Sequence, residues 1–146
     1  MSGIAGSDAL PDTWCIEDAL KAISHRGPNG TRVVEANGIT LGQVWPKARE
    51  HMMDADDEVT AVLDGEVYNW HDIQPGATSP LEAIEQAYGE QGSAFVKKID
   101  GHFALAVASS DGIFLARDPV GVVPLYYSSN GSVSFASELR ASIISG

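Results

Sequence analysis

The sequence predicts an α+β domain in which two antiparallel sheets face each other and helices cover their outer faces. Short stretches of strand-forming residues recur along the 146 residues, and the dipeptides Asn37-Gly38, Asp111-Gly112 and Asn130-Gly131 between them favour tight β-hairpins. Only a few segments have helical spacing, and they do not alternate regularly with the strands, which favours helices segregated to outer faces. The number of strands suits two facing sheets.

The first part of the chain predicts three strands and one helix. Residues 2–6 form an apolar strand at a terminus, where polar, frayed residues are the norm. A helix follows, capped by Asp12 or Thr13, with an apolar face of Ile16, Ala19, Leu20 and Ile23. Residues 25–30 (HRGPNG) form a turn, residues 31–45 hold two strands joined at residues 37–38, and residues 46–58 form a polar surface loop.

The remainder of the chain predicts five strands and three helices. A strand over residues 58–70 is interrupted at Asp64-Gly65, and residues 79–82 (SPLE) form a capping box that starts an amphipathic helix running through Tyr88. A short helix covers residues 93–99. The segments HFALAVAS, GIFLARD, PLYYSS and SVSFAS are strands, with one of the two adjacent tyrosines, Tyr126 and Tyr127, facing inward, and ELRASII begins a last helix.

Composition limits the classes of function. The formal net charge of −11 argues against a nucleic-acid or anionic-membrane partner, because both require a basic face. A single cysteine, Cys15, excludes an internal disulfide, and the absence of a signal segment or long apolar run favours a cytoplasmic protein. We expect one domain over residues 1–146, no metal and no cofactor, since the histidines lack metal-ligand spacing and no phosphate-binding loop occurs. The oligomeric state, including a homo-oligomer, stays open.

Five collinear stretches carry a resemblance to a known family: SGIAG at the start, HRGPNG, DGEVYN, DGHFALAV, and ARDPVGVVPLYY followed by FASELRA. Together they resemble the class II glutamine amidotransferase domain, in the version found at the N-terminus of asparagine synthetases. The resemblance implies a four-layer αββα sandwich of the N-terminal-nucleophile hydrolase type. It also implies glutamine hydrolysis by a cysteine exposed on removal of the initiator methionine, with its own α-amino group as the base.

Two positions of the implied catalytic machinery differ from the family. Ser2 stands at the nucleophile position, and a hydroxyl is a poorer nucleophile than a thiolate. If Met1 is retained, the nitrogen of Ser2 lies in a peptide bond and is no base. Asp64 stands where the family has an asparagine that donates to the oxyanion, while Gly65 of the same oxyanion-hole motif matches. We therefore expect Ser2 to be inactive as a nucleophile.

The implied glutamine pocket has also changed. Trp45 replaces the arginine that holds the α-carboxylate of glutamine, and Arg49 is the nearest substitute. Pro80 stands where the family has an acidic residue that binds the ammonium group. Glu66 matches the family. The pocket thus loses the charged groups for both ends of a zwitterion.

Other matching residues predict structural roles. Arg26 organises buried carbonyl groups and the first strand, and His25 beside it is structural. Arg117 and Asp118 precede a Gly/Pro loop and form a partly buried ion pair. The small and polar residues at 78–80 are also fully explained as a helix cap.

Three hypotheses follow for function. The first is an amidotransferase-like domain without glutaminase activity that serves as a structural or regulatory partner of an ATP-dependent, amide-forming ligase of the asparagine synthetase type. The second is an active N-terminal-nucleophile amidohydrolase that uses Ser2 on glutamine or another amide. The third is a small-molecule sensing module whose pocket, rimmed by Asp64, Glu66 and Trp45, takes a cationic or aromatic ligand.

Overall fold

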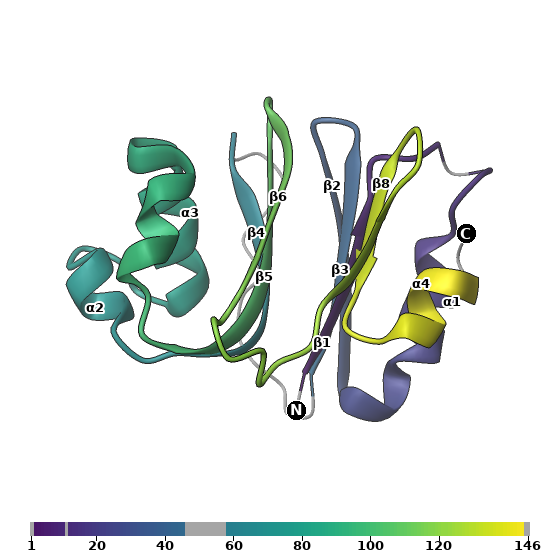
Figure 1. The fold of residues 1–146 in the computed structure, drawn as a ribbon, viewed down its shortest axis with the longest axis horizontal. Coiled ribbons are helices and arrows are strands. Elements are labelled where there is room, and N and C mark those ends of the chain that lie inside the picture. Colours follow the sequence, from purple (N-terminus) through teal and green to yellow (C-terminus); the bar gives the residue numbers. More distant parts are fainter. Residues whose placement is uncertain (1, 11, 46–57, 145–146) are drawn as a thin grey trace.

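The protein is a stack of four layers, seen edge-on in Figure 1. The computed structural model describes residues 2–10, 12–45 and 58–144. Two antiparallel sheets form the inner layers, and helices cover the outer face of each sheet. On one side these helices are α1 (Ile16–Ala22) and α4 (Leu139–Ile144). On the other side they are α2 (Trp70–Ile73) and α3 (Pro80–Gln91). The predicted αββα sandwich is confirmed.

The two sheets differ in their number of strands. The five-stranded sheet has the order β2-β3-β1-β8-β7, and the three-stranded sheet has the order β4-β5-β6. The strands of the first are β1 (Gly3–Ser7), β2 (Gly30–Ala36), β3 (Ile39–Trp45), β7 (Tyr126–Ser129) and β8 (Val133–Ala136). Those of the second are β4 (Thr60–Val67), β5 (Gly101–Ser109) and β6 (Gly112–Arg117). The N-terminal strand β1 therefore lies in the middle of its sheet.

The predicted hairpins are present. Strands β2 and β3 pair through the turn at Asn37 and Gly38, whose φ angles of 54° and 74° are those of a type I′ turn. Strands β5 and β6 pair next to Asp111 and Gly112, and β7 and β8 pair around Asn130. Strands β6 and β7, although successive, lie in different sheets, so residues 118–125 cross from one sheet to the other.

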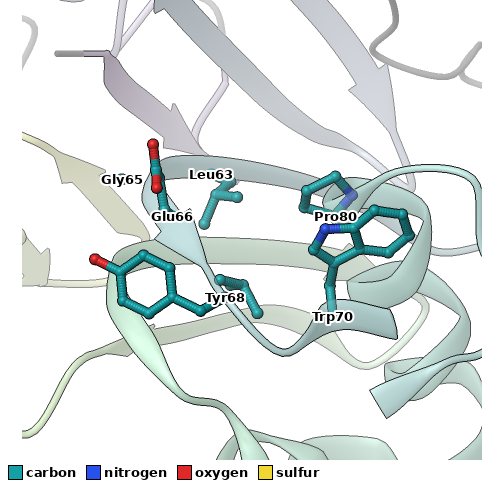
Figure 2. Close-up of a pocket in the computed structure, with 7 residues that line it drawn as sticks. Leu63, Gly65, Glu66, Tyr68, Trp70 and Pro80 are labelled. Carbon is teal, nitrogen blue, oxygen red and sulfur yellow. The ribbon is translucent and has the colours of Figure 1, made fainter. Parts of the chain in front are cut away.

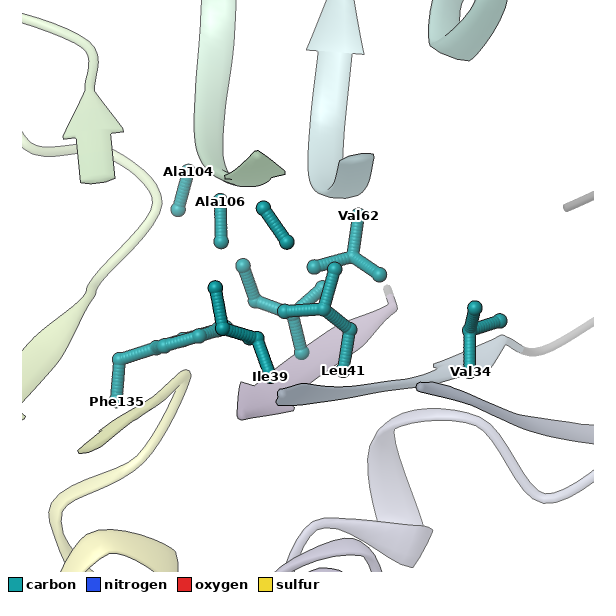
Figure 3. Packing of buried hydrophobic residues seen from close by; sticks show 9 residues of the cluster. Val34, Ile39, Leu41, Val62, Ala104, Ala106 and Phe135 are labelled. Carbon is teal, nitrogen blue, oxygen red and sulfur yellow. The ribbon is translucent and has the colours of Figure 1, made fainter. Parts of the chain in front are cut away.

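The core between the sheets is built from alternating side chains. Along β5, Ala104, Ala106 and Ala108 face the five-stranded sheet, while Leu105 and Val107 face the helices. This is the two-residue period of a strand that is buried on both faces. Figure 3 shows Ala104 and Ala106 opposite larger side chains of the other sheet, among them Ile39, Leu41 and Phe135. Ile4 and Val34 belong to the same cluster.

The start of α3 confirms the predicted capping box in a modified form. The Ser79 hydroxyl accepts from the Glu82 backbone N–H at 3.2 Å. The Glu82 carboxylate reaches back to the backbone N–H of Thr78, at 2.8 Å, and to its hydroxyl. The Thr78 hydroxyl and N–H lower the pKa of Glu82, and α3 continues to Gln91 rather than ending near Tyr88.

Several local predictions are wrong. Cys15, and neither Asp12 nor Thr13, is the N-terminal cap of α1, and no side chain caps it; the Thr13 hydroxyl instead donates to the Leu10 carbonyl at 2.8 Å. Strand β4 runs unbroken through Asp64 and Gly65.

Two further predicted elements differ in detail. The predicted helix over residues 93–99 is the 3₁₀ helix η2 (Gly92–Lys98). Of the predicted surface loop, residues 46–57 lie outside the described residues.

Candidate functional site

The site lies where the start of β1 meets β4 across the two sheets. The Ser2 hydroxyl donates to Oδ1 of Asp64 at 2.9 Å. The backbone N–H of Gly65 points at the same hydroxyl oxygen at 3.4 Å. The fold thus brings together the predicted nucleophile position and both predicted oxyanion-hole positions, which are more than 60 residues apart in sequence.

Gly65 holds a backbone conformation that this geometry requires. Its φ of +93° is strained for any residue with a side chain. A Cβ atom there would lie 2.1 Å from the carbonyl oxygen of His102 on the neighbouring strand. The conformation keeps β4 in register, with Gly65 opposite Phe103, while the N–H is directed away from β5 toward Ser2. The turn or bulge expected at Asp64-Gly65 is therefore replaced by a glycine with positive φ within a continuous strand.

Arg26 contacts three separate segments of the site. It lies at the end of the 3₁₀ helix η1 (Ser24–Arg26) and is 9% exposed. Its Nε donates to the Ser2 carbonyl at 2.8 Å, and its Nη2 lies 3.1 Å from Oδ2 of Asp64. Its Nη1 lies 3.3 Å from Oε1 of Glu138, which also meets Nε2 of the exposed His25 at 2.8 Å. One guanidinium therefore connects the first strand, β4 and the segment after β8.

Asp64 accepts three hydrogen bonds from side chains. It is 2% exposed and accepts hydrogen bonds from Ser2 Oγ, from Arg26 Nη2 and, at 3.1 Å, from Ser137 Oγ. Ser137 Oγ in turn accepts from the backbone N–H of Ile4 at 2.8 Å. An ionised carboxylate only accepts hydrogen bonds, so Asp64 has no proton to offer a reacting group. The arrangement is a buried ion pair bridging the two sheets.

Sequence reasoning did not single out Ser137 and Glu138. Both belong to the FASELRA stretch, which we used for the resemblance without assigning roles. The sequence offered one indication, which is that this stretch follows a predicted strand. In the structure that strand, β8, pairs antiparallel with β1, so the two residues after it lie beside the start of β1. The pairing could be read only from the structure.

A pocket of about 300 Å³ opens beside this network, at the end of β4 (Figure 2). Its lining residues are Leu63, Gly65, Glu66, Val67, Tyr68, Trp70 and Pro80. Three predicted site positions, Gly65, Glu66 and Pro80, therefore share one cavity. Tyr68 and Trp70 complete its wall and were missed, because nothing in the sequence marks an aromatic residue as lining a pocket rather than packing in the core.

The structure does not bring Trp45 to this pocket. Trp45 ends β3, is half-buried, and packs against the core between the sheets. Its ring lies over Gly30, where an added Cβ would sit 2.0 Å from the indole Nε1. A side chain held against glycine in this way is explained by packing, and Trp45 is not among the residues that line the pocket at the end of β4. Its place in a ligand pocket stays a prediction.

The predicted ion pair between Arg117 and Asp118 is also wrong. The Arg117 side chain is exposed, and in the described residues no ion pair joins it to Asp118. The buried Asp118 carboxylate accepts from the backbone N–H groups of Phe103, Val122 and Val123 at 3.0–3.3 Å. Burial raises the pKa of Asp118, but the backbone N–H donors outweigh it and hold the pKa below 3.8. Asp118 organises the crossing between the sheets.

Two further properties bear on the class of protein. Within residues 2–10, 12–45 and 58–144, no group of three or more His, Cys, Asp or Glu side chains is placed to hold a metal ion. In the same residues, no helix has the length and apolar character needed to cross a membrane.

Two stacked antiparallel sheets with outer helices, and a first strand that starts at the polar site, define the architecture of the N-terminal-nucleophile hydrolases. Among solved structures, the chain is similar to a glutamine phosphoribosylpyrophosphate amidotransferase of B. subtilis, with a TM-score of 0.73. The match covers 99% of this chain and 43% of that one, at 16% identity, so it supports the fold.

The family follows from sequence. The model of the glutamine amidotransferase domain matches residues 1–145, and the chain belongs to this family. Glutamine-hydrolyzing asparagine synthetase 3 of Arabidopsis thaliana is 34% identical over 145 residues, covering 86% of this chain and 25% of that protein. Asparagine synthetase 2 of Bacillus subtilis is 27% identical over 161 residues, covering 97% and 22%. The chain thus spans about a quarter of the length of these relatives.

Proposed function

We propose that this amidotransferase domain does not hydrolyse glutamine and serves as a structural or regulatory partner of an ATP-dependent, amide-forming ligase of the asparagine synthetase type. The observation that supports the proposal is the Arg26–Asp64 ion pair. It involves the residue that, by the resemblance to the family, replaces an asparagine that donates to the oxyanion. On this reading residues 1–146 act as one domain, in the cytoplasm and without a cofactor.

The catalytic argument concerns hydrogen-bond donors. Attack on a glutamine amide places negative charge on the carbonyl oxygen, and loss of one donor to that oxygen typically slows such reactions by about 10²–10³-fold. Among the described residues, the Gly65 N–H is the one backbone donor that points at the Ser2 hydroxyl, and the Asp64 oxygens accept hydrogen bonds from three side chains. A hydroxyl nucleophile further lowers the expected rate relative to a thiol.

The binding argument concerns charge. Glutamine is a zwitterion, and a pocket selects it with a cation for the carboxylate and an anion for the ammonium group. None of the seven described lining residues is cationic, and Glu66 is the single carboxylate among them. Arg26 is buried and committed to Asp64, Glu138 and the Ser2 carbonyl, so it does not serve as the missing cation.

A partner role is supported by apolar side chains that are exposed on both faces of the edge strand β7 and beside it. Five large apolar side chains are exposed on β7, the segment before it and the start of α4: Val120, Val122, Tyr126, Tyr127 and Leu139. We call this the β7 surface. In a chain of net charge −11, such a surface favours burial against another protein. The curated relatives carry about three quarters of their length outside the matched region, and we commit to a ligase of their type as the occupant.

Ammonia release from glutamine tests the loss of activity. We expect no release above background from the wild-type chain, from Ser2→Cys, or from Ser2→Cys combined with Asp64→Asn, because none of the described lining residues offers a cation to the α-carboxylate in any of the three. Arg49, the nearest substitute in sequence, lies outside the described residues. Intact-mass measurement establishes for each protein whether Met1 has been removed. Activity restored by Ser2→Cys alone would overturn the proposal and support the second hypothesis, a working amidohydrolase.

A further inference from the structure

We propose that the pocket at the end of β4 binds a primary amine with an apolar or aromatic body and no carboxylate. The inference shares with the proposed function the missing carboxylate clamp, but it does not depend on the ligase partner. It rests on the chemistry of the pocket wall and on what the neighbouring polar groups are already bound to.

The wall of the pocket combines one anion with aromatic and aliphatic surface. Figure 2 shows the ring of Tyr68 on one side of the cavity, and the ring of Trp70 beside Pro80 on the other side. The carboxylate of Glu66 lies on the Tyr68 side. A carboxylate next to aromatic faces is the combination that attracts an ammonium group, through charge and through the negative face of each ring. Leu63 and Val67 supply an apolar floor for the rest of a ligand.

The Glu66 carboxylate is available for a ligand. It is exposed, and in the described ranges it makes no hydrogen bond or ion pair, whereas the nearby Asp64 accepts three hydrogen bonds from side chains. The aromatic residues are held in place by other groups: the Tyr68 hydroxyl meets Nδ1 of His102 at 3.2 Å, and the Trp70 ring stacks on His71 at 3.5 Å. The pocket is therefore preorganised around one unused negative charge.

The neighbouring helix start offers no site for an anion. Pro80, the first residue of α3, has no N–H, and the Glu82 N–H is bound by Ser79. Glu82 itself places a negative charge in the first turn, where it offsets the helix dipole. A ligand carboxylate in the pocket would therefore face Glu66 and gain no N–H from Pro80 or Glu82. An amine without this group avoids the repulsion.

The size of the pocket fits a small ligand. About 300 Å³ is at the lower end of the range for small-molecule sites. We choose 2-phenylethylammonium as the probe, with L-phenylalanine and 3-phenylpropionate as matched compounds. L-phenylalanine is the probe with a carboxylate added, and 3-phenylpropionate is the probe with its ammonium group replaced by a carboxylate.

Binding is measured by titration in two-dimensional ¹H–¹⁵N NMR spectra. We expect 2-phenylethylammonium to shift the amide signals of residues 63–68 and 70, L-phenylalanine to bind at least about fivefold more weakly, and 3-phenylpropionate to cause no shift. Glu66→Gln should weaken binding of the amine about fivefold, the value of an exposed charge pair. Glu35→Gln, the same change at an exposed site on β2, should leave binding unchanged.

Three results would overturn the inference: no binding of the amine by the folded protein, equal binding of L-phenylalanine, or an affinity insensitive to Glu66→Gln. Each can occur while the protein still releases no ammonia from glutamine. Failure here is thereby separated from failure of the proposed function, which would appear as glutaminase activity.

Discussion

Replacing Asp64 with asparagine tests whether the altered catalytic position now holds the two sheets together. Asparagine has the same shape, and its amide can satisfy the present contacts: the oxygen can accept from Arg26 and Ser137, and the nitrogen can donate to Ser2 once that hydroxyl rotates. The substitution therefore removes one negative charge with little change in packing or in the number of hydrogen bonds.

The expected cost follows from burial. The side chains of Arg26 and Asp64 are 8% and 3% exposed, and removing one partner of a buried pair costs about 3–5 kcal/mol when the other charge is left alone. Arg26 keeps Glu138 at 3.3 Å, a partner that is 27% exposed and only partly compensates. We therefore expect the free energy of unfolding to fall by about 2–3 kcal/mol. For a chain of this length that lowers Tm by about 7–10 °C.

Thermal and urea unfolding followed by circular dichroism measure this loss. Asp72→Asn is the matched control, because Asp72 is exposed on α2 and the substitution makes the same change in net charge. A double-mutant cycle with Arg26→Gln should give a coupling energy above about 1 kcal/mol, since the two side chains are in direct contact. An Asp64→Asn protein with the Tm of the control would refute the idea that this ion pair stabilises the fold.

Two other predictions concern regions outside the network. Asp118→Asn should destabilise the protein by about 2–4 kcal/mol at neutral pH, because the new amide group would face backbone N–H donors. The lowered pKa of Asp118 means that its contribution is complete above pH 3.8 and is lost as the pH falls through its lower folded value. Urea titrations at several acidic pH values should show this variant losing less stability than wild type below pH 3.8; parallel curves would contradict the assignment. Tyr127→Lys on the β7 surface should abolish co-purification with a co-expressed asparagine synthetase-type ligase that lacks its own amidotransferase half, while Leu10→Lys, at another exposed apolar residue, should not. Equal retention of both variants would exclude the β7 surface as the contact.

Local chemistry made much of the fold predictable. The turn at Asn37 and Gly38 requires positive φ at both positions, and Asn-Gly adopts positive φ readily. The hairpin could therefore be predicted from this dipeptide alone. The start of α3 was equally local, because Ser79 and Glu82 are three residues apart and cap the same turn. The prediction for α1 failed because its cap involves no side-chain hydrogen bond, which leaves no sequence signal.

Predictions that depended on neighbours in sequence failed for a geometric reason. Arg117 ends β6 and Asp118 follows directly, and adjacent residues of an extended chain point to opposite sides. One side chain therefore enters the interior and the other faces solvent. Tyr126 and Tyr127 also alternate, yet both are exposed, because β7 is the edge strand of its sheet. The sequence does not say which strand lies at an edge.

Several residues of the candidate site could be predicted from the sequence, but the hydrogen bonds and ion pairs between them could not. The partners of Asp64 come from residues 38 and 73 positions away, and their meeting depends on β1 pairing with β8 in one sheet while facing β4 in the other. The sequence identified a carboxylate in place of an amide. Only the structure shows that Arg26 forms an ion pair with it, a contact that we expect to stabilise the fold.

The state of the polar groups supports a structural use of this site. Catalytic centres commonly hold polar groups that stay unsatisfied or strained until substrate binds, and they keep this arrangement at a cost in stability. Here Gly65 has a positive φ that glycine adopts without strain, and the Asp64 carboxylate is bound by the Ser2 hydroxyl and the Arg26 guanidinium. Buried atoms without a hydrogen-bond partner, such as Trp14 Nε1 and Thr60 Oγ1, belong to other parts of the described chain. We therefore propose that the ion pair opposes glutamine hydrolysis, because the paired Asp64 carboxylate offers no hydrogen-bond donor to an oxyanion beside Ser2.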